Sequence, residues 1–132
     1  MLKTIGAAVA IAVPLLALAA PAEAAARPGW LCDFDGGGDS GMTGVGCENS
    51  SGVIGIAYYD DGDVLRVTDR HGTSTKSAIG YLEVAGSGTS VFTGGTSEHH
   101  LSFTEGKKVR VKVCTSGGSD KFCSPWSRYG RT

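Results

Sequence analysis

Four cysteines are the residues of this chain whose type and spacing define a chemistry most narrowly: Cys32, Cys47, Cys114 and Cys123. Zinc sites place cysteines roughly two to four residues apart with further ligands nearby, whereas these spacings are longer and lack histidine neighbours. An even number of cysteines in a short exported chain predicts disulfides. Three pairings are possible. We favour Cys32–Cys47 and Cys114–Cys123, because the members of each pair are close in sequence and separated by glycine-rich stretches.

Ser40 is a candidate nucleophile, because it lies in Gly38-Asp39-Ser40-Gly41, a string that resembles the surroundings of the nucleophile in trypsin-like proteases. In that family a histidine activates the serine and backbone amides form an oxyanion hole. The family's histidine precedes its serine, whereas His71, His99 and His100 all follow Ser40. We therefore expect that the protein is not an enzyme, and a small hydrolase is the least favoured of three functional hypotheses.

Carboxylates gather in two segments, and clustered oxygen ligands can bind Ca²⁺. Asp33, Asp35 and Asp39 form a weak calcium candidate, and the turn containing Asp60, Asp61 and Asp63 a weaker one. Neither segment has the spacing of an EF-hand loop, and Asp-Gly clusters are frequent in ordinary turns. We predict no resident metal and no cofactor.

The adjacent histidines His99 and His100 point to opposite faces if they lie on a strand, so they cannot chelate one metal together. We expect His99 to be partly buried beside Leu101 and Phe103, and His100 to face solvent. His71 falls in a predicted turn.

Aromatic side chains are the remaining binding candidates. A sandwich of this size buries one tryptophan, and the other aromatics could stack on a sugar ring or anchor a protein. The candidates are Trp30, Tyr59, Trp126 and Tyr129, together with Lys121 and Phe122 on the segment between Cys114 and Cys123.

Short alternating segments separated by glycine-rich turns must position these residues. The chain has 21 glycines in 132 residues, and we find no sustained apolar period of a helix. This pattern predicts an all-β protein. The expected strands cover residues 29–34, 53–59, 63–69, 77–84, 90–94, 98–103, 107–113 and 122–126, with a surface loop over 33–46.

Two of these segments predict hairpins. Asp61-Gly62 is a turn pair between two alternating arms. Ile54, Ile56 and Tyr58 share one face of the first arm, so Tyr58 and Tyr59 point to opposite faces. The strand 107–113 and the returning segment 122–126 would form a second hairpin, stapled by Cys114–Cys123.

The last third, with "HHLSFTEGKKVRVKVC" and "CSPWS", resembles a fibronectin type III or immunoglobulin-like sandwich. The resemblance implies a small antiparallel sandwich with a proline-containing edge strand, where a missing N–H is tolerated. "DGDVLRVTDRHG", "EGKKVRVKVC" and "CSPW" are also similar to small secreted proteins of actinobacteria. That likeness supports the fold and the two disulfides and implies no activity.

The N-terminal residues predict export. Lys3, an apolar run and Ala22-Glu23-Ala24 form a signal peptide over residues 1–26, cleaved after Ala24 or Ala26. Residues 27–132 then form one secreted, extracellular domain. The net charge of −1 argues against nucleic acid as a partner, and we expect a monomer with no membrane association after signal removal. We favour a non-catalytic binding module for an extracellular protein or a wall polysaccharide. The alternative is an inhibitor of an extracellular hydrolase that inserts Lys121 or Phe122.

Overall fold

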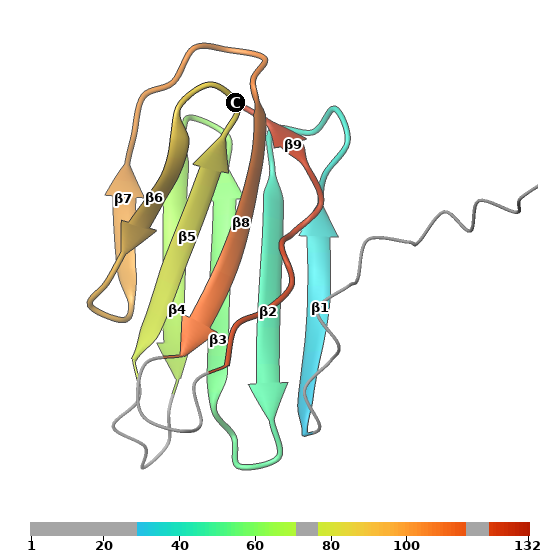
Figure 1. Ribbon diagram of the computed structural model, residues 1–132, viewed down its shortest axis with the longest axis vertical. Coiled ribbons are helices and arrows are strands. Elements are labelled where there is room, and N and C mark those ends of the chain that lie inside the picture. The colour runs from blue at the N-terminus through green and yellow to red at the C-terminus, as the bar shows by residue number, and fades with distance from the viewer. Residues whose placement is uncertain (1–28, 71–76, 116–121) are drawn as a thin grey trace, which may run out of the picture.

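Two antiparallel β-sheets face each other in a computed structural model of the protein, which describes residues 29–70, 77–115 and 122–132 (Figure 1). One sheet has the strand order β1-β2-β3-β4-β7 and the other β6-β5-β8-β9. The predicted all-β sandwich is therefore confirmed. The strands are β1 (Trp30–Gly36), β2 (Thr43–Asn49), β3 (Ile54–Asp60), β4 (Val64–Arg70), β5 (Ala78–Val84), β6 (Gly88–Phe92), β7 (Ser97–His100), β8 (Lys108–Thr115) and β9 (Gly130–Arg131).

The strand β2 was not predicted, and the expected surface loop over residues 33–46 is wrong. β1 continues to Gly36 and β2 begins at Thr43, so only residues 37–42 connect them. Thr43, Val45 and Cys47 are all buried on one face of β2. Glycines at positions 44 and 46 occupy the other face, so the segment lacks the outward side chains that make an alternating pattern visible.

The predicted hairpin between β3 and β4 is confirmed. Asp60 pairs with Val64, so the connection consists of Asp61, Gly62 and Asp63. Gly62 and Asp63 have φ values of 83° and 60°. Glycine adopts this left-handed region without strain, and aspartate is among the residues that tolerate it.

Both predicted disulfides are present, Cys32–Cys47 between β1 and β2 and Cys114–Cys123 between β8 and the C-terminal segment. Cys32 and Cys47 are direct cross-strand partners. Such bonds are characteristic of proteins that fold in an oxidising compartment.

The core lies between the sheets and consists mainly of valines from β2, β4 and β8 around Leu65, Leu82 and Tyr59. Gly80 on β5 allows a close approach of the two sheets, because a Cβ atom there would lie 2.5 Å from Val67 Cγ2. Trp30 and Phe122 stack at one end, with ring centroids 4.3 Å apart.

Residues 122–126 do not form the regular returning strand that the sequence predicts. Cys114–Cys123 is an isolated bridge, and serine hydroxyls complete the attachment to β8. The amide of Val113 donates to Ser124 Oγ at 3.0 Å, and the amide of Val111 donates to Ser127 Oγ at 2.9 Å. The same serines donate their amides to the carbonyls of Val113 and Val111. Pro125 has no amide to donate, so a continuous ladder is impossible here.

Candidate functional site

An apolar strip crosses the outer face of the five-stranded sheet, which is turned away from the core. Gly55, Ala57 and Tyr59 are the buried residues of β3, so Ile54, Ile56 and Tyr58 project outward and are half-buried. Leu31 on β1 faces the same side and is 74% exposed. An open antiparallel sheet normally places polar residues on its solvent face. This strip, formed by Leu31, Ile54, Ile56 and Tyr58, is therefore a candidate contact surface.

Glycines on β2 form the floor of this strip. Gly46 pairs with Ile56, and Gly44 pairs with Tyr58. A Cβ atom at Gly44 would lie 2.3 Å from Tyr58 Cδ2, so the tyrosine ring lies directly across the glycine. A shallow groove of about 310 Å³ remains beside Gly46, with walls formed by Leu31, Asp33, Glu48, Ile54 and Ile56.

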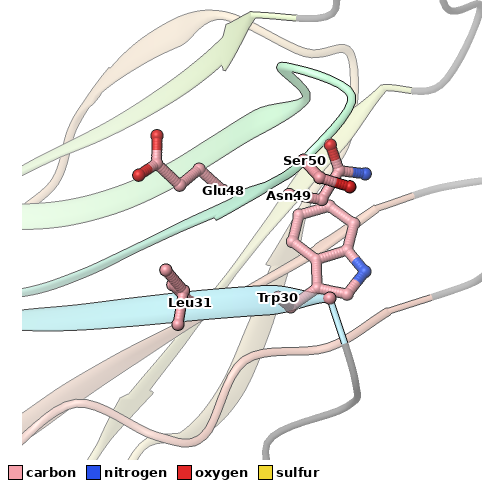
Figure 2. A pocket seen from close by; sticks show the side chains of 6 residues that line it. Trp30, Leu31, Glu48, Asn49 and Ser50 are labelled. Carbon is pink, nitrogen blue, oxygen red and sulfur yellow. The ribbon is translucent and has the colours of Figure 1, made fainter.

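A second depression of about 390 Å³ lies on the other side of Leu31, at the end of β1. Figure 2 shows its lining: Trp30 and Leu31 come from β1, Glu48 and Asn49 come from β2, and Ser50 follows β2. The side chains of Leu31 and Glu48 are shared by both depressions. Leu31 therefore stands as an exposed ridge between two shallow hollows.

Tyr58 closes the other end of the strip. Its hydroxyl lies 3.3 Å from Met42 Sδ. Partial burial raises the pKa of Tyr58, and the carboxylates of Asp35, Asp60 and Asp61 raise it further. The phenol is therefore neutral at physiological pH and presents an uncharged edge to any partner.

Ion pairs border the strip on the β4 and β7 side. Arg66 bonds to Asp60 Oδ2 at 2.6 Å and to Glu98 Oε2 at 3.0 Å. His100 lies 2.9 Å from the other Glu98 oxygen. Hydrogen bonds from Arg66 lower the pKa values of both carboxyls. These exposed pairs fix a polar rim and contribute little to stability.

The outer face of the four-stranded sheet carries alternating cations and aromatic rings. Lys112 lies over Tyr81 at 4.8 Å and over Trp126 at 4.6 Å from the ring centroid. Arg110 lies over Trp126 at 4.7 Å and over Tyr129 at 4.8 Å. Lys108 follows over Tyr129 at 5.6 Å. This cation–aromatic ladder holds the C-terminal segment against β8 where regular strand pairing is absent.

The aromatic residues that the sequence analysis named as binding candidates differ in their burial and contacts. Tyr59 is only 1% exposed and Phe122 only 6% exposed, so the predictions that they contact a partner are wrong. The rings of Trp126 and Tyr129 each contact two cations of β8, and Tyr129 remains 42% exposed. Tyr59 is buried because it lies on the same core-facing side of β3 as Gly55 and Ala57. Lys121 lies outside the described residues.

The aspartates of the proposed calcium loop are not brought together. Asp33 and Asp35 lie on β1, and Asp39 in the following loop is 4.0 Å from Arg131 Nε. Over residues 29–70, 77–115 and 122–132, no group of three or more histidine, cysteine, aspartate or glutamate side chains is placed to hold a metal.

The carboxylates of the second predicted segment have separate roles. Asp60 pairs with Arg66. Asp63 accepts hydrogen bonds from the hydroxyl of Tyr59 and from the amide of Phe103. The side chain of Asp61 lies over Gly41.

Ser40 and the histidines occupy different parts of the five-stranded sheet. Ser40 lies between β1 and β2, and its Oγ accepts the amide of Met42 at 3.2 Å. His99 and His100 lie on β7, the opposite edge strand. His99 is half-buried against Phe92 and bonds to Ser97, whereas His100 is exposed, as expected. His71 falls outside the part of the chain that the structure describes.

Comparison with protein-family models, with curated proteins and with solved structures finds no match to this chain. Within its described ranges, the protein contains no helix that is long and apolar enough to span a membrane.

Proposed function

We propose that the protein is a secreted, non-catalytic binding module that contacts an extracellular protein through the apolar strip. One observation carries this proposal: Leu31, Ile54, Ile56 and Tyr58 form a continuous apolar surface on the outer face of a sheet whose other face already packs against the core. Interfaces concentrate their energy in such central apolar residues, surrounded by a polar rim. Asp33, Glu48 and the Arg66 ion pairs provide this rim.

Export is supported by the two disulfides and by the signal-like residues 1–26. The resemblance of the last third to fibronectin type III domains also suits a binding module. Sequencing of the N-terminus of protein purified from culture fluid tests the export, with cleavage expected after Ala24 or Ala26.

A protein partner fits the geometry better than a wall polysaccharide. Sugars stack on open aromatic faces, whereas the apolar strip consists of aliphatic side chains and one half-buried tyrosine. The inhibitor hypothesis loses Phe122, which packs on Trp30 in the core. The hydrolase hypothesis requires a base near Ser40, but the hydroxyl of Ser40 accepts the amide of Met42. The described histidines, His99 and His100, contact Ser97 and Glu98 instead.

Capture of partners from the culture fluid and wall fraction of the producing organism tests the proposal. Leu31→Lys places a charge in the strip. Val91→Lys is the matched control, because Val91 is a 53% exposed residue on β6 in the other sheet. We expect Leu31→Lys to abolish capture of the partner and Val91→Lys to retain it. Equal capture by both variants would contradict the use of the strip, and selective capture on insoluble wall polysaccharide would favour the glycan alternative.

A further inference from the structure

Within the described residues, the edge strand β1 leaves one side of its backbone open. It pairs with β2 on one side, and no other described strand pairs with it. The Cα atoms of Cys32 and Cys47 are 4.1 Å apart, the spacing of a pair that does not exchange backbone hydrogen bonds. Leu31, Asp33 and Asp35 therefore bond toward β2. The backbone groups of Trp30, Cys32 and Phe34 point to the open side, where an added strand would bond.

The side chains along this edge are not those of a fully blocked strand. Leu31 is 74% exposed and Phe34 is 38% exposed. Two shallow hollows flank Leu31. Natural edge strands are usually short or heavily charged, whereas β1 has seven residues and exposes the apolar side chains of Leu31 and Phe34 beside its two aspartates. Such an edge can accept a further strand, with backbone hydrogen bonds providing affinity and side-chain pockets providing specificity.

The charges on β1 indicate which kind of strand its open edge can bind. Asp33 and Asp35 face outward on β1, and no described lysine or arginine forms an ion pair with either. A second copy in antiparallel pairing centred on Phe34 would place Asp33 opposite Asp35 of the copy, and Asp35 opposite its Asp33. Like charges on adjacent strands are destabilising, and opposite charges are stabilising. The complementary strand therefore carries basic residues.

We infer that the open edge of β1 binds an extended segment of the partner protein, with basic residues beside Asp33 and Asp35 and an apolar residue beside Leu31. This inference rests on the proposed function, because the added strand would continue the sheet whose outer face carries the apolar strip. The segment adds a sixth strand to the sheet. Its basic side chains pair with the aspartates, while its apolar side chain fills a hollow beside Leu31.

A seven-residue peptide tests the edge directly in the disulfide-bonded protein. It carries lysines at the two positions opposite Asp33 and Asp35, and valine opposite Leu31. We expect binding that protects the amides of Trp30, Cys32 and Phe34 from hydrogen exchange. A peptide with glutamate in place of lysine, and one with N-methyl groups on the amides that face β1, should both fail to bind.

Variants of the protein test the role of charge. We expect Asp33→Lys to weaken peptide binding by about tenfold, because it replaces an attraction with a repulsion. Glu105→Lys is the matched control, since Glu105 is an exposed carboxylate in the turn before β8, and it should bind normally. Asp35→Asn provides a milder change, with an expected loss of about threefold.

Three results would overturn the inference: binding of the glutamate peptide equal to that of the lysine peptide, protection of amides elsewhere, or a dimer through β1 in sedimentation. The capture experiment separates this failure from failure of the proposed function. If Leu31→Lys abolishes capture while the lysine peptide does not bind, the apolar strip is the contact surface and the edge is not. If neither Leu31→Lys nor Asp33→Lys affects capture, both proposals fail.

Discussion

Trp30 and Phe122 stack face to face between the two sheets, with centroids 4.3 Å apart and an interplanar angle of 2°. Trp30 begins β1, while Phe122 precedes the second cysteine of the C-terminal disulfide. The stack therefore joins the N-terminal strand of one sheet to the C-terminal segment of the other. It also makes Phe122 a core residue.

Phe122→Ala should lower the free energy of unfolding by about 3 kcal/mol, because it removes a buried ring and leaves a cavity. Val91→Ala, on an exposed position, should change it by less than about 0.5 kcal/mol. Urea titrations of both variants with intact disulfides provide the measurement. Equal stability of Phe122→Ala and the wild type would show that the ring is free, as the inhibitor hypothesis requires.

The cation–aromatic ladder predicts a measurable coupling between Arg110 and Trp126. Trp126→Leu removes two cation contacts, each worth about 0.5–1 kcal/mol, so we expect a loss of about 1–2 kcal/mol. In a double-mutant cycle with Arg110→Gln, the coupling energy should be about 0.5–1 kcal/mol. Lys107→Gln is the control, because Lys107 is exposed and lies over none of the described aromatic rings. Purely additive effects of Arg110→Gln and Trp126→Leu would mean that the ladder does not contribute to stability.

Gly80 and Val67 should behave as an interacting pair across the core. Gly80→Ala would place a Cβ atom 2.5 Å from Val67 Cγ2, and overpacking of this kind costs about 1–3 kcal/mol. Val67→Ala removes the obstructing methyl groups. We expect the double variant to be at least about 1 kcal/mol more stable than the sum of the single effects predicts. Additivity in thermal and urea unfolding would show that the sheets separate to accommodate the alanine.

The alternation of apolar and polar residues along the sequence predicted those strands that have apolar side chains on one face and polar side chains on the other. Residues 108–113 alternate lysine or arginine with valine, so β8 was predicted closely. β2 was missed because Gly44 and Gly46 remove its outward side chains. The signal that could have found it is the alternation of glycine with Thr43, Val45 and Cys47.

The candidate site was harder to predict, because alternation does not say which face is inside. The core side of β3 is narrow at Gly55, since Val113 Cγ2 would lie 3.2 Å from a Cβ atom there. That contact joins residues distant in sequence, and it favours the orientation in which Ile54 and Ile56 face outward. The ladder likewise pairs the cations of β8 with rings on other segments, Tyr81 on β5 and Trp126 and Tyr129 near the C-terminus. The triplets Ser124-Pro125-Trp126 and Ser127-Arg128-Tyr129 repeat the serine and aromatic positions and would have been the signal.

Ser40→Ala should leave the fold and any measured activity unchanged. Its hydroxyl accepts one exposed backbone amide, from Met42, so its removal costs little. Incubation of the pure protein with a fluorophosphonate probe checks for a reactive serine, and we expect no labelling. Labelling that disappears in Ser40→Ala would identify a hydrolase and contradict the proposed absence of catalysis.

Tyr59 should make stability fall at alkaline pH. Its burial raises the pKa of the phenol, and the hydrogen bond to Asp63 raises it further. The folded protein therefore holds the phenolic proton more tightly than the unfolded chain does. The contribution of the protonated Tyr59 phenol to the free energy of unfolding is fully present below the pKa of the unfolded chain, near 10.0. This contribution is lost as the pH rises from there through the pKa of the folded protein. The slope in this range should approach about 1.4 kcal/mol per pH unit.

Tyr59→Phe separates this effect from general alkaline denaturation. At pH 7 the variant should lose about 1–2 kcal/mol, because Asp63 loses a hydrogen-bond donor while retaining the amide of Phe103 at 2.9 Å. Above pH 10 the variant should lack the wild-type slope, so the two stability curves converge. Urea midpoints measured from pH 7 to pH 11 test this, with Tyr129→Phe as the control because Tyr129 is 42% exposed. Parallel curves for Tyr59→Phe and the wild type would show that ionisation of Tyr59 does not limit the stability of the fold.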